Sequence, residues 1–456
     1  MSVAGVATAS TAAAQHVHPA APPTSDVRPA SPLAAVPPDK LGPGVVPVTT
    51  PDVPDMPWRL EGGVKVFEIA AEHVRTEFLP GRVVDAWGFN GSVPGPTIQV
   101  NEGDRVRLIV ENRLPEGFSM HWHGLEIPNE MDGMPGISQE LIPPGGKFAY
   151  EFTLHQNGTF FYHSHMAMQE MMGLIGTFII HPRAAHAPKV DRDFAIVLQE
   201  WAILPNNTIP NTLAMEFNWL TLNGKAGPAT TPLLCKIGER VRVRFVNLGM
   251  DHHPMHLHGH QFVVTGTEGG RIRTTAEERQ NTVLVGVAQA RDIEFVANNP
   301  GDWHLHCHLP HHMMNQMASM VGPTMSGGGM RPGDMTKGMG IVNGPALGGS
   351  AGPAFGRTIG AGAEAERPAP NMPLAQQPSA LLAAQRTAPN GDMFPGYPQD
   401  MFMTMDDMVA KPETYGLRPG WTGGTMGMMT IVRVLKPELF NKIADLKAEQ
   451  ARKARG

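Results

Sequence analysis

Alternating apolar and polar residues predict a chain built largely of short β-strands. Residues 97–100 and 106–110 alternate on either side of a turn and predict a hairpin. The same pair of runs returns at residues 233–237 and 241–246. Because each pair precedes a histidine-rich motif, the pattern indicates an internal repeat of one β-rich unit. Closely spaced strands with turn signals favour a sandwich or a barrel.

One strand-like run, which ends in His-Cys-His, carries unusual chemistry. If this run is extended, successive side chains point to opposite faces. His306 and His308 then share one face, and Cys307 projects from the other. A blue copper site uses a cysteine thiolate, two histidines and a weak axial methionine. Cys307, His312 and Met317 supply three of these four groups.

A second motif, His-Pro-Met-His-Leu-His, supplies the missing histidine. His256 and His258 share one face, whereas His253 lies on the other and can complete the site of Cys307. Two more His-x-His pairs stand upstream, and four pairs in this order are hard to explain as packing. The pairs are His121 and His123, His163 and His165, His256 and His258, and His306 and His308.

These motifs resemble the four copper motifs of the multicopper oxidases, over roughly residues 60–323. The resemblance implies an all-β fold of two cupredoxin-like Greek-key β-sandwich domains. It also implies four copper ions: one of type 1, one of type 2 and a type 3 pair. The implied type 1 ligands are His253, Cys307, His312 and Met317. The implied type 2 ligands are His121 and His256, and the implied type 3 ligands are His123, His163, His165, His258, His306 and His308.

The resemblance implies an enzyme that couples one-electron oxidation of a donor to four-electron reduction of dioxygen to water. Electrons would enter at the type 1 copper and pass through Cys307. The donor stays open among Cu(I), another metal and phenols, as in cuprous oxidases and laccases. The alternatives are a copper nitrite reductase and a non-catalytic copper-binding or electron-transfer protein. A nitrite reductase would carry its blue-copper cysteine in the first domain, where Ser164 stands between the histidines.

Asp132, eleven residues after His121, stands where similar bacterial members of the family carry a carboxylate near the copper cluster. We expect it to relay protons or to orient the ligands. The alternative is that Asp132 only forms the turn before Gly133. Two departures leave the proton supply open: Met313 follows His312 where many three-domain members have an acid, and Ile127 replaces a tyrosine of small two-domain laccases.

The spacing of the motifs indicates two domains, because only about 90 residues separate His165 from His253. Three-domain members of the family have a spacer domain there. Its absence implies a homotrimer, in which the three-copper cluster forms at the subunit interfaces. We expect a disordered segment at 1–57, domain one at 58–183, domain two with the type 1 copper at 184–323, a Gly/Met/Pro-rich low-complexity linker at 324–392, and a Met-rich segment with a short helix opened by Pro437 at 393–456.

The resemblance implies dioxygen and a small reducing substrate as partners, and composition argues against two other classes of partner. The formal net charge of −6 gives no basic footprint for nucleic acid or anionic membranes. No apolar run approaches the ~18 residues of a membrane-spanning helix. The first residues are similar to the end of a secretory signal without its basic region, and the resemblance favours a periplasmic or secreted protein. Cys235 is expected to be a buried hydrophobe. The C-terminal methionines, if folded over the type 1 copper, would exclude bulky phenols and offer thioethers to Cu(I).

Overall fold

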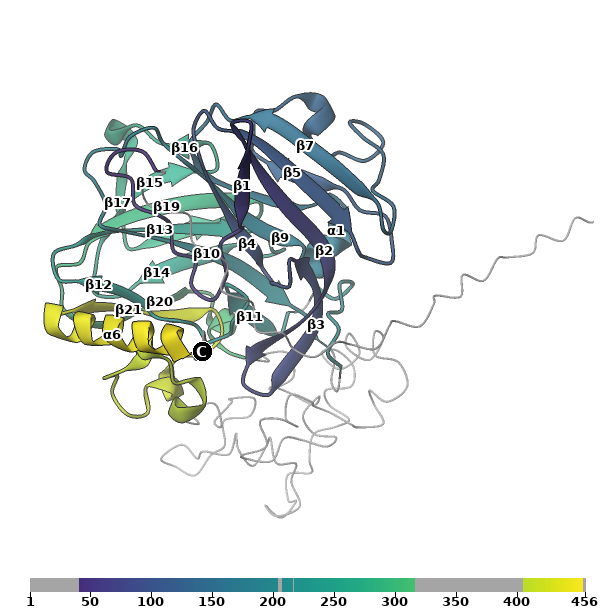
Figure 1. The fold of residues 1–456 in the computed structure, drawn as a ribbon. Helices are drawn as coiled ribbons and strands as arrows, with labels where there is room; N and C mark the ends of the chain where they lie inside the picture. Colours follow the sequence, from purple (N-terminus) through teal and green to yellow (C-terminus); the bar gives the residue numbers. More distant parts are fainter. Residues whose placement is uncertain (1–40, 204–206, 216, 316–404, 454–456) are drawn as a thin grey trace, which may run out of the picture.

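A computed structural model describes residues 41–203, 207–215, 217–315 and 405–453 of the chain. Two β-sandwiches lie side by side (Figure 1), and the few helices are short except for one near the C-terminus. The all-β class is therefore confirmed. Met317, the expected linker at 324–392 and the expected disordered residues 1–40 lie outside the described ranges. None of the helices in those ranges has the length and apolar character that crossing a membrane requires.

The first sandwich packs a five-stranded sheet against a four-stranded sheet. The first sheet has the order β1-β2-β5-β7, with β3 paired to β2, and the second has the order β4-β9-β8-β6. Phe67, Trp122 and Tyr150 are among the side chains of one buried core between the two sheets. The bounds are β1 (Trp58–Glu61), β2 (Val64–Leu79), β3 (Arg82–Phe89), β4 (Gly95–Asn101), β5 (Arg105–Asn112), β6 (Met120–His123), β7 (Lys147–Thr153), β8 (Gly158–Ser164) and β9 (Ile175–His181).

The hairpin expected from residues 97–100 and 106–110 is wrong. β4 pairs with β9 in one sheet, whereas β5 pairs with β2 and β7 in the other. The turn between them carries the chain across the sandwich, so Ile98 and Leu108 enter the same core from opposite sides. The second pair of runs behaves alike, because β12 and β13 also lie in different sheets. Alternation predicts that a run is a strand but not which sheet it joins.

The second sandwich packs a seven-stranded sheet against a five-stranded sheet. The orders are β11-β10-β13-β19-β15-β16, with β17 paired to β15, and β12-β21-β20-β14-β18. Phe245, Met255 and Val432 belong to the core between them. The bounds are β10 (Arg192–Trp201), β11 (Trp219–Leu222), β12 (Leu233–Lys236), β13 (Arg240–Asn247), β14 (His253–Leu257), β15 (Phe262–Thr267), β16 (Gly270–Arg271), β17 (Glu278–Gln280), β18 (Thr282–Val285), β19 (Gln289–Val296), β20 (Gly301–Cys307) and β21 (Met429–Leu435).

The C-terminal segment is part of the second sandwich, so the expected end of domain two at residue 323 is wrong. β21 lies between β12 and β20, and all of its residues are buried (Figure 1). Helix α6 (Pro437–Lys453) follows it, beginning at the expected proline. The short helices are α1 (Ala167–Met171), η2 (Asn129–Met131), η3 (Thr274–Ala276), η4 (Pro310–Met313), η8 (Asp406–Val409), η9 (Pro412–Thr414) and η10 (Trp421–Gly424).

Part of the expected disordered N-terminal segment is ordered. The side chain of Gln99 bonds both the N–H and the C=O of Val48, at 2.9 Å each. Thr49 forms a bridge to Phe194 of β10, and Val48 is buried with Ile179 and Ala195. This stretch therefore joins the two sandwiches. No signal in the sequence indicates this role, because two buried residues leave no periodic pattern.

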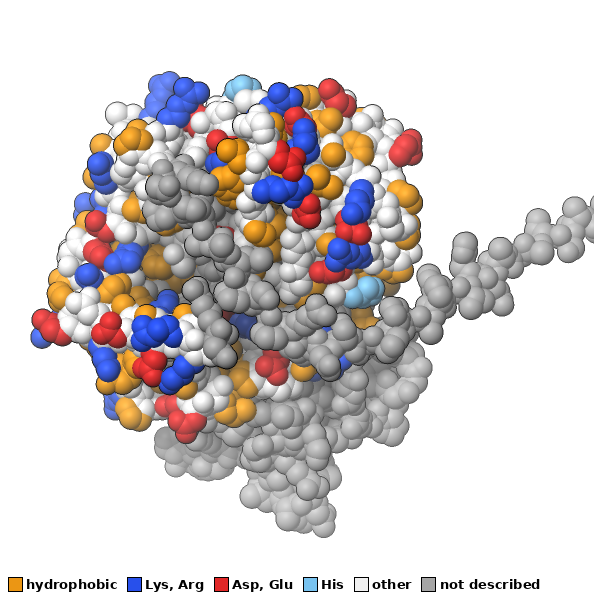
Figure 2. Space-filling model, viewed as in Figure 1, with side chains coloured by type: hydrophobic (Ala, Val, Ile, Leu, Met, Phe, Trp, Pro, Cys, Tyr) orange, Lys and Arg blue, Asp and Glu red, His pale blue; other side chains and the backbone are white. Residues whose placement is uncertain are grey.

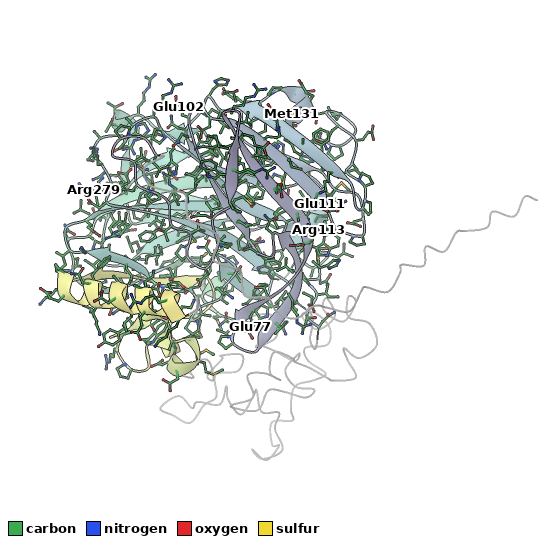
Figure 3. The ribbon with its side chains drawn as sticks, in the orientation of Figure 1. Glu77, Glu102, Glu111, Arg113, Met131 and Arg279 are labelled. Carbon is green, nitrogen blue, oxygen red and sulfur yellow. The ribbon has the colours of Figure 1, made fainter. Side chains whose placement is uncertain are left out.

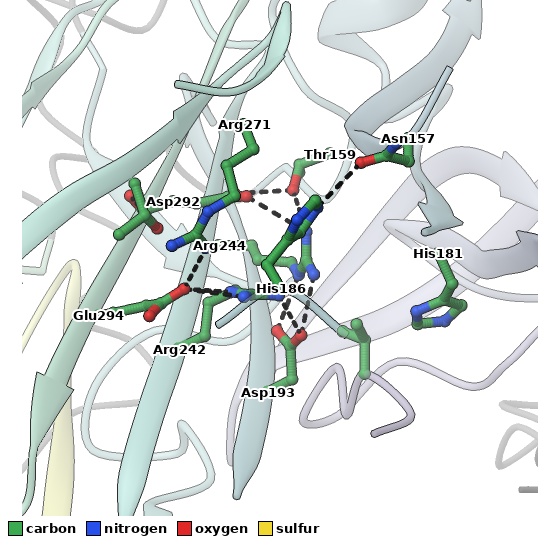
Figure 4. A network of polar contacts seen from close by, with 12 residues as sticks. Asn157, Thr159, His181, His186, Asp193, Arg242, Arg244, Arg271, Asp292 and Glu294 are labelled. Carbon is green, nitrogen blue, oxygen red and sulfur yellow. Dashed lines mark hydrogen bonds and ion pairs between the residues drawn. The ribbon is translucent and has the colours of Figure 1, made fainter. Parts of the chain in front are cut away.

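A buried network of charges also joins the two sandwiches (Figure 4). Thr159 of β8 donates to Asp292 of β19 at 2.7 Å, and Arg244 of β13 donates to Thr159 at 2.7 Å. Arg244 also binds Asp193 through two bonds, of 2.7 and 2.8 Å. Since the Arg244 side chain is only 4% exposed, these groups depend on each other for hydrogen bonds. Residue 159 is thereby fixed against the second domain.

The surface, by contrast, carries mixed charges and simple ion pairs. Basic and acidic side chains are interspersed over the face in Figure 2. Arg113, for example, binds Glu111 and Glu72 at 2.9 Å each, and the first pair is labelled in Figure 3. Exposed pairs of this kind contribute little to stability.

Candidate metal centres

Cys307, His253 and His312 converge at a buried site, which we call the cysteine site. Cys307 Sγ lies 3.7 Å from His253 Nδ1 and 3.4 Å from His312 Nδ1, and the two nitrogens are 3.2 Å apart. All three side chains are buried. One sulfur and two imidazole nitrogens in this arrangement suit a copper ion of the blue type, so the residues fit that group.

The protonation state of the Cys307 thiol depends on whether a cation is bound at the cysteine site. Burial raises the pKa of the Cys307 thiol to about 12 and lowers the pKa of the His312 imidazole to about 3. Without a metal ion the site therefore holds a neutral thiol and a neutral imidazole at pH 7. A thiolate ligand forms only when a bound cation replaces the thiol proton.

The start of β21 holds the two chain segments that carry these ligands. The carbonyl of Met428 accepts the N–H of Cys307 at 3.0 Å, and the N–H of Met428 donates to the carbonyl of His312 at 2.9 Å. Gly427 has a φ of +61°, and a Cβ there would lie 2.3 Å from the His312 carbonyl oxygen. Only glycine fits this close approach. The C-terminal segment thus fixes the loop that presents His312.

Four histidines of the first sandwich form a second cluster, the domain-one histidine group. Adjacent strands β6 and β8 place His121 opposite His163. Ligand nitrogens of His121, His123 and His163 lie within 4.8 Å of one another, and His123 Nδ1 is 3.2 Å from His163 Nε2. The ring of His165 lies 5.3 Å from that of His121. Burial lowers the pKa of His123 to about 4, which keeps it neutral and able to bind a metal.

The second sandwich presents a matching domain-two histidine group. β14 and β20 pair with His256 opposite His306, and His258 Nε2 lies 3.0 Å from His306 Nε2. The ring of His308 lies 5.5 Å from that of His256. The strand alternation expected from the sequence is thus realised, because Cys307 faces the cysteine site and its two neighbours face this group. His258 and His308 are exposed.

The two histidine groups remain apart within one chain. Among the described residues, no candidate metal group and no ring contact includes members of both. Each group offers four imidazoles, and the sequence pattern predicted one set of eight.

Carboxylates lie beside each centre. The Nδ1–H of His121 donates to the carbonyl of Asp132 at 2.7 Å, and the Asp132 carboxylate lies 3.5 Å away. Asp132 is thus placed to orient His121, while its proton relay stays a prediction. Glu170 of α1 contacts His163 Nδ1, and the sequence pattern gave no signal for it.

Two further carboxylates adjoin the cysteine site, and the sequence pattern missed both. Glu200 Oε2 lies 3.2 Å from His253 Nε2, and Asp251 Oδ2 lies 3.5 Å from His312 Nε2. Asp251, His311 and His312 form a third candidate metal group within 4.8 Å. His311 is exposed at the edge of the site.

Comparisons with known proteins agree with this geometry. Models of the multicopper oxidase family match residues 70–185 and 203–323. Copper resistance protein A of Pseudomonas syringae pv. tomato is 42% identical over 123 residues, 27% of this chain and 20% of that protein. Multicopper oxidase MmcO of Mycobacterium tuberculosis is 28% identical over 253 residues, 48% of this chain and 49% of that protein. The chain thus spans about half or less of the length of such curated relatives.

A solved structure extends the similarity. Blue copper oxidase from Nitrosomonas europaea is 30% identical, with a TM-score of 0.52, over 55% of this chain and 81% of that chain. The multicopper oxidase mgLAC is also 30% identical, with a TM-score of 0.50 over the same shares of the two chains.

Proposed function

Because the chain belongs to the multicopper oxidases, we propose that it couples one-electron oxidation of a small donor to the reduction of dioxygen to water. Four one-electron oxidations of the donor would supply the four electrons that this reduction needs, and these electrons would be stored on four copper ions. The cysteine site would hold one of them as type 1 copper, and Met317 remains the proposed axial ligand. The two histidine groups would hold the other three, with His121 and His256 as the type 2 ligands. The six remaining histidines of the groups would hold the type 3 pair.

One observation carries this proposal: Cys307 connects two centres through its own backbone. Its side chain enters the cysteine site, whereas His306 and His308 belong to the domain-two histidine group. A covalent path of a few bonds therefore links the electron-entry site to the proposed oxygen site. Ser164 occupies the matching place between the domain-one histidines, which argues against a nitrite reductase. Similarity to copper resistance proteins supports a periplasmic or secreted location.

We propose that the cluster is completed by a second copy of the chain, in a homotrimer. The exposed His258 and His308 support this, because a neighbour's domain-one group could cover them. Repeating one head-to-tail contact three times closes a ring. Sedimentation should show a trimer, and an active, fully metallated monomer would contradict it.

A mixing experiment tests the shared cluster directly. The variants His163→Ala and His258→Ala each damage one histidine group, and each alone should be inactive. When the two variants are co-assembled in equal amounts, they should recover about a quarter of wild-type turnover. Each half of a shared site is intact in about half of the cases, so both halves are intact in about a quarter. If each chain builds its own cluster, mixing will recover nothing.

The proposed donor is a small metal cation such as Cu(I), and Asp251 with His311 would receive it. Among the described residues, the buried Nε2 of His312 has no hydrogen-bond partner, and it points to Asp251. This edge therefore leads into the cysteine site. We expect Asp251→Asn to lower kcat/KM for Cu(I) about tenfold or more, as for lost metal-binding partners. The phenol-dependent rate should change little. Oxygen uptake with each donor measures both, with Asp445→Asn on α6 as the control. Equal losses for the two donors would exclude a cation site here.

A further inference from the structure

A buried carboxylate lies on the side of His253 that faces away from Cys307. Glu200, near the end of β10, has a fully buried side chain, and its Oε2 lies 3.2 Å from His253 Nε2. Its Oε1 accepts the N–H of Asp251 at 2.8 Å and also the N–H of Met250. The loop at 249–251 therefore closes around this one side chain.

The contacts of Glu200 leave its charge without a basic partner. No lysine or arginine among the described residues forms an ion pair with Glu200, although Asp193 on the same strand binds two arginines. Three N–H donors satisfy its oxygens but bring no formal positive charge. A buried charge is costly unless it is paired. The nearest place for a balancing cation is the cysteine site, on the other side of the His253 ring.

The hydrogen bond also fixes the ring of His253. If Nε2 carries the proton and donates to Glu200, Nδ1 is left with its lone pair facing Cys307. Such outer hydrogen bonds set the tautomer of a metal-binding histidine and make it a stronger ligand. His312 differs, because its Nε2 has no hydrogen-bond partner in the part of the chain that the structure describes.

We propose that Glu200 is a positioning residue that holds His253 in its ligating orientation and lowers the reduction potential of the type 1 copper. The inference rests on the proposed function, which supplies the copper and the donor. When the donor gives one electron to the site, the charge of the site falls by one and no bond is broken. A fixed negative charge nearby favours the oxidised, more positive state over the reduced state. Glu200 therefore opposes reduction of the site.

The test is Glu200→Gln in the full-length, copper-loaded protein, with the potential measured by redox titration of the blue absorption. Glutamine keeps the size and an acceptor oxygen but removes the charge. We expect the reduced-to-oxidised ratio to rise at least tenfold at a given potential, a shift of about +59 mV for a one-electron couple. Glu200→Asp, which keeps the charge, should restore much of the wild-type potential. Glu239→Gln removes an equal charge, bonded to Arg192 instead, and should leave the potential unchanged.

A second variant covers the case in which Glu200→Gln does not fold. A Cβ at Gly249 would lie 2.0 Å from Glu200 Oε2, so Gly249→Ala should push the carboxylate away and also raise the potential. A blue variant of either kind with an unchanged potential would overturn the inference. A wild-type protein that binds copper without any blue absorption would instead overturn the proposed function.

Discussion

Replacing Cys307 with serine is expected to abolish the blue absorption and the dioxygen-coupled turnover. A serine hydroxyl is not a thiolate, so the variant loses the sulfur ligand, which is the end of the proposed electron path at the cysteine site. The backbone from residue 307 to His306 and His308 remains. The loss of turnover should exceed the ~10–100-fold that follows from removing an outer partner of a metal ligand. Visible spectra, copper analysis and oxygen uptake on one sample measure the effect. Copper held by the two histidine groups should largely remain.

The chain offers a matched control in its second cysteine. Cys235 is also buried, its thiol donates to the carbonyl of Arg433, and no histidine contacts it among the described residues. Cys235→Ser introduces the same change into the same domain and should keep colour and turnover. Full activity in Cys307→Ser, or equal losses in both variants, would show that the proposed electron path is wrong.

Replacing Arg244 with methionine is expected to cause the largest loss of stability. The change leaves Asp193, Asp292 and Thr159 buried without their shared donor. Removing one partner of a buried charge network costs about 3–5 kcal/mol. Urea unfolding, followed at one fixed protein concentration, measures the difference from wild type. The control is Arg105→Met, because the Arg105 side chain is 61% exposed and its pair with Glu151 should contribute little. Equal losses in the free energy of unfolding for the two variants would mean that the buried network stabilises the protein no more than an exposed ion pair does.

Acid should weaken the buried charge network, to which Glu294 also belongs, only at low pH. Burial raises the pKa of Glu294, but Arg242 and Arg271 outweigh it and hold the value at about 2. Because the pKa of Glu294 in the folded state lies below its ordinary value of 4.5, Glu294 makes its full contribution to the free energy of unfolding above pH 4.5. This contribution is lost as the pH falls from about 4.5 towards 2.

The sequence predicted which of the described histidine and cysteine side chains gather, because strand residues obey a local rule. Side chains of a strand alternate between faces, so the spacing within β14 and β20 assigns His253 and Cys307 to one site and their neighbours to another. The supporting carboxylates do not obey such a rule. Glu200 reaches His253 from a strand 53 residues earlier in the chain. The two residues lie in different sheets, so only the packing of one sheet on the other brings them together.

The difference between local patterns and long-range contacts also explains why the expected domain boundaries were wrong. β21 enters a sheet whose other strands end more than a hundred residues earlier in the chain, so no local pattern indicates its place. Residues around Val48 join the first sandwich through two hydrogen bonds to Gln99, and they join the second through the bridge of Thr49 to Phe194. Local periodicity predicted the strands, and long-range pairing decided how they were combined.

The contact of Thr159 with Arg244 and Asp292 has a consequence for counting subunits. The contact fixes the angle between the two sandwiches of one chain. In a head-to-tail assembly, this angle sets the rotation that relates each subunit to the next. A turn of one third of a circle closes after three copies, whereas a slightly different turn produces an open spiral. A side chain that is not itself a proposed metal ligand would therefore decide whether the ends of the assembly meet.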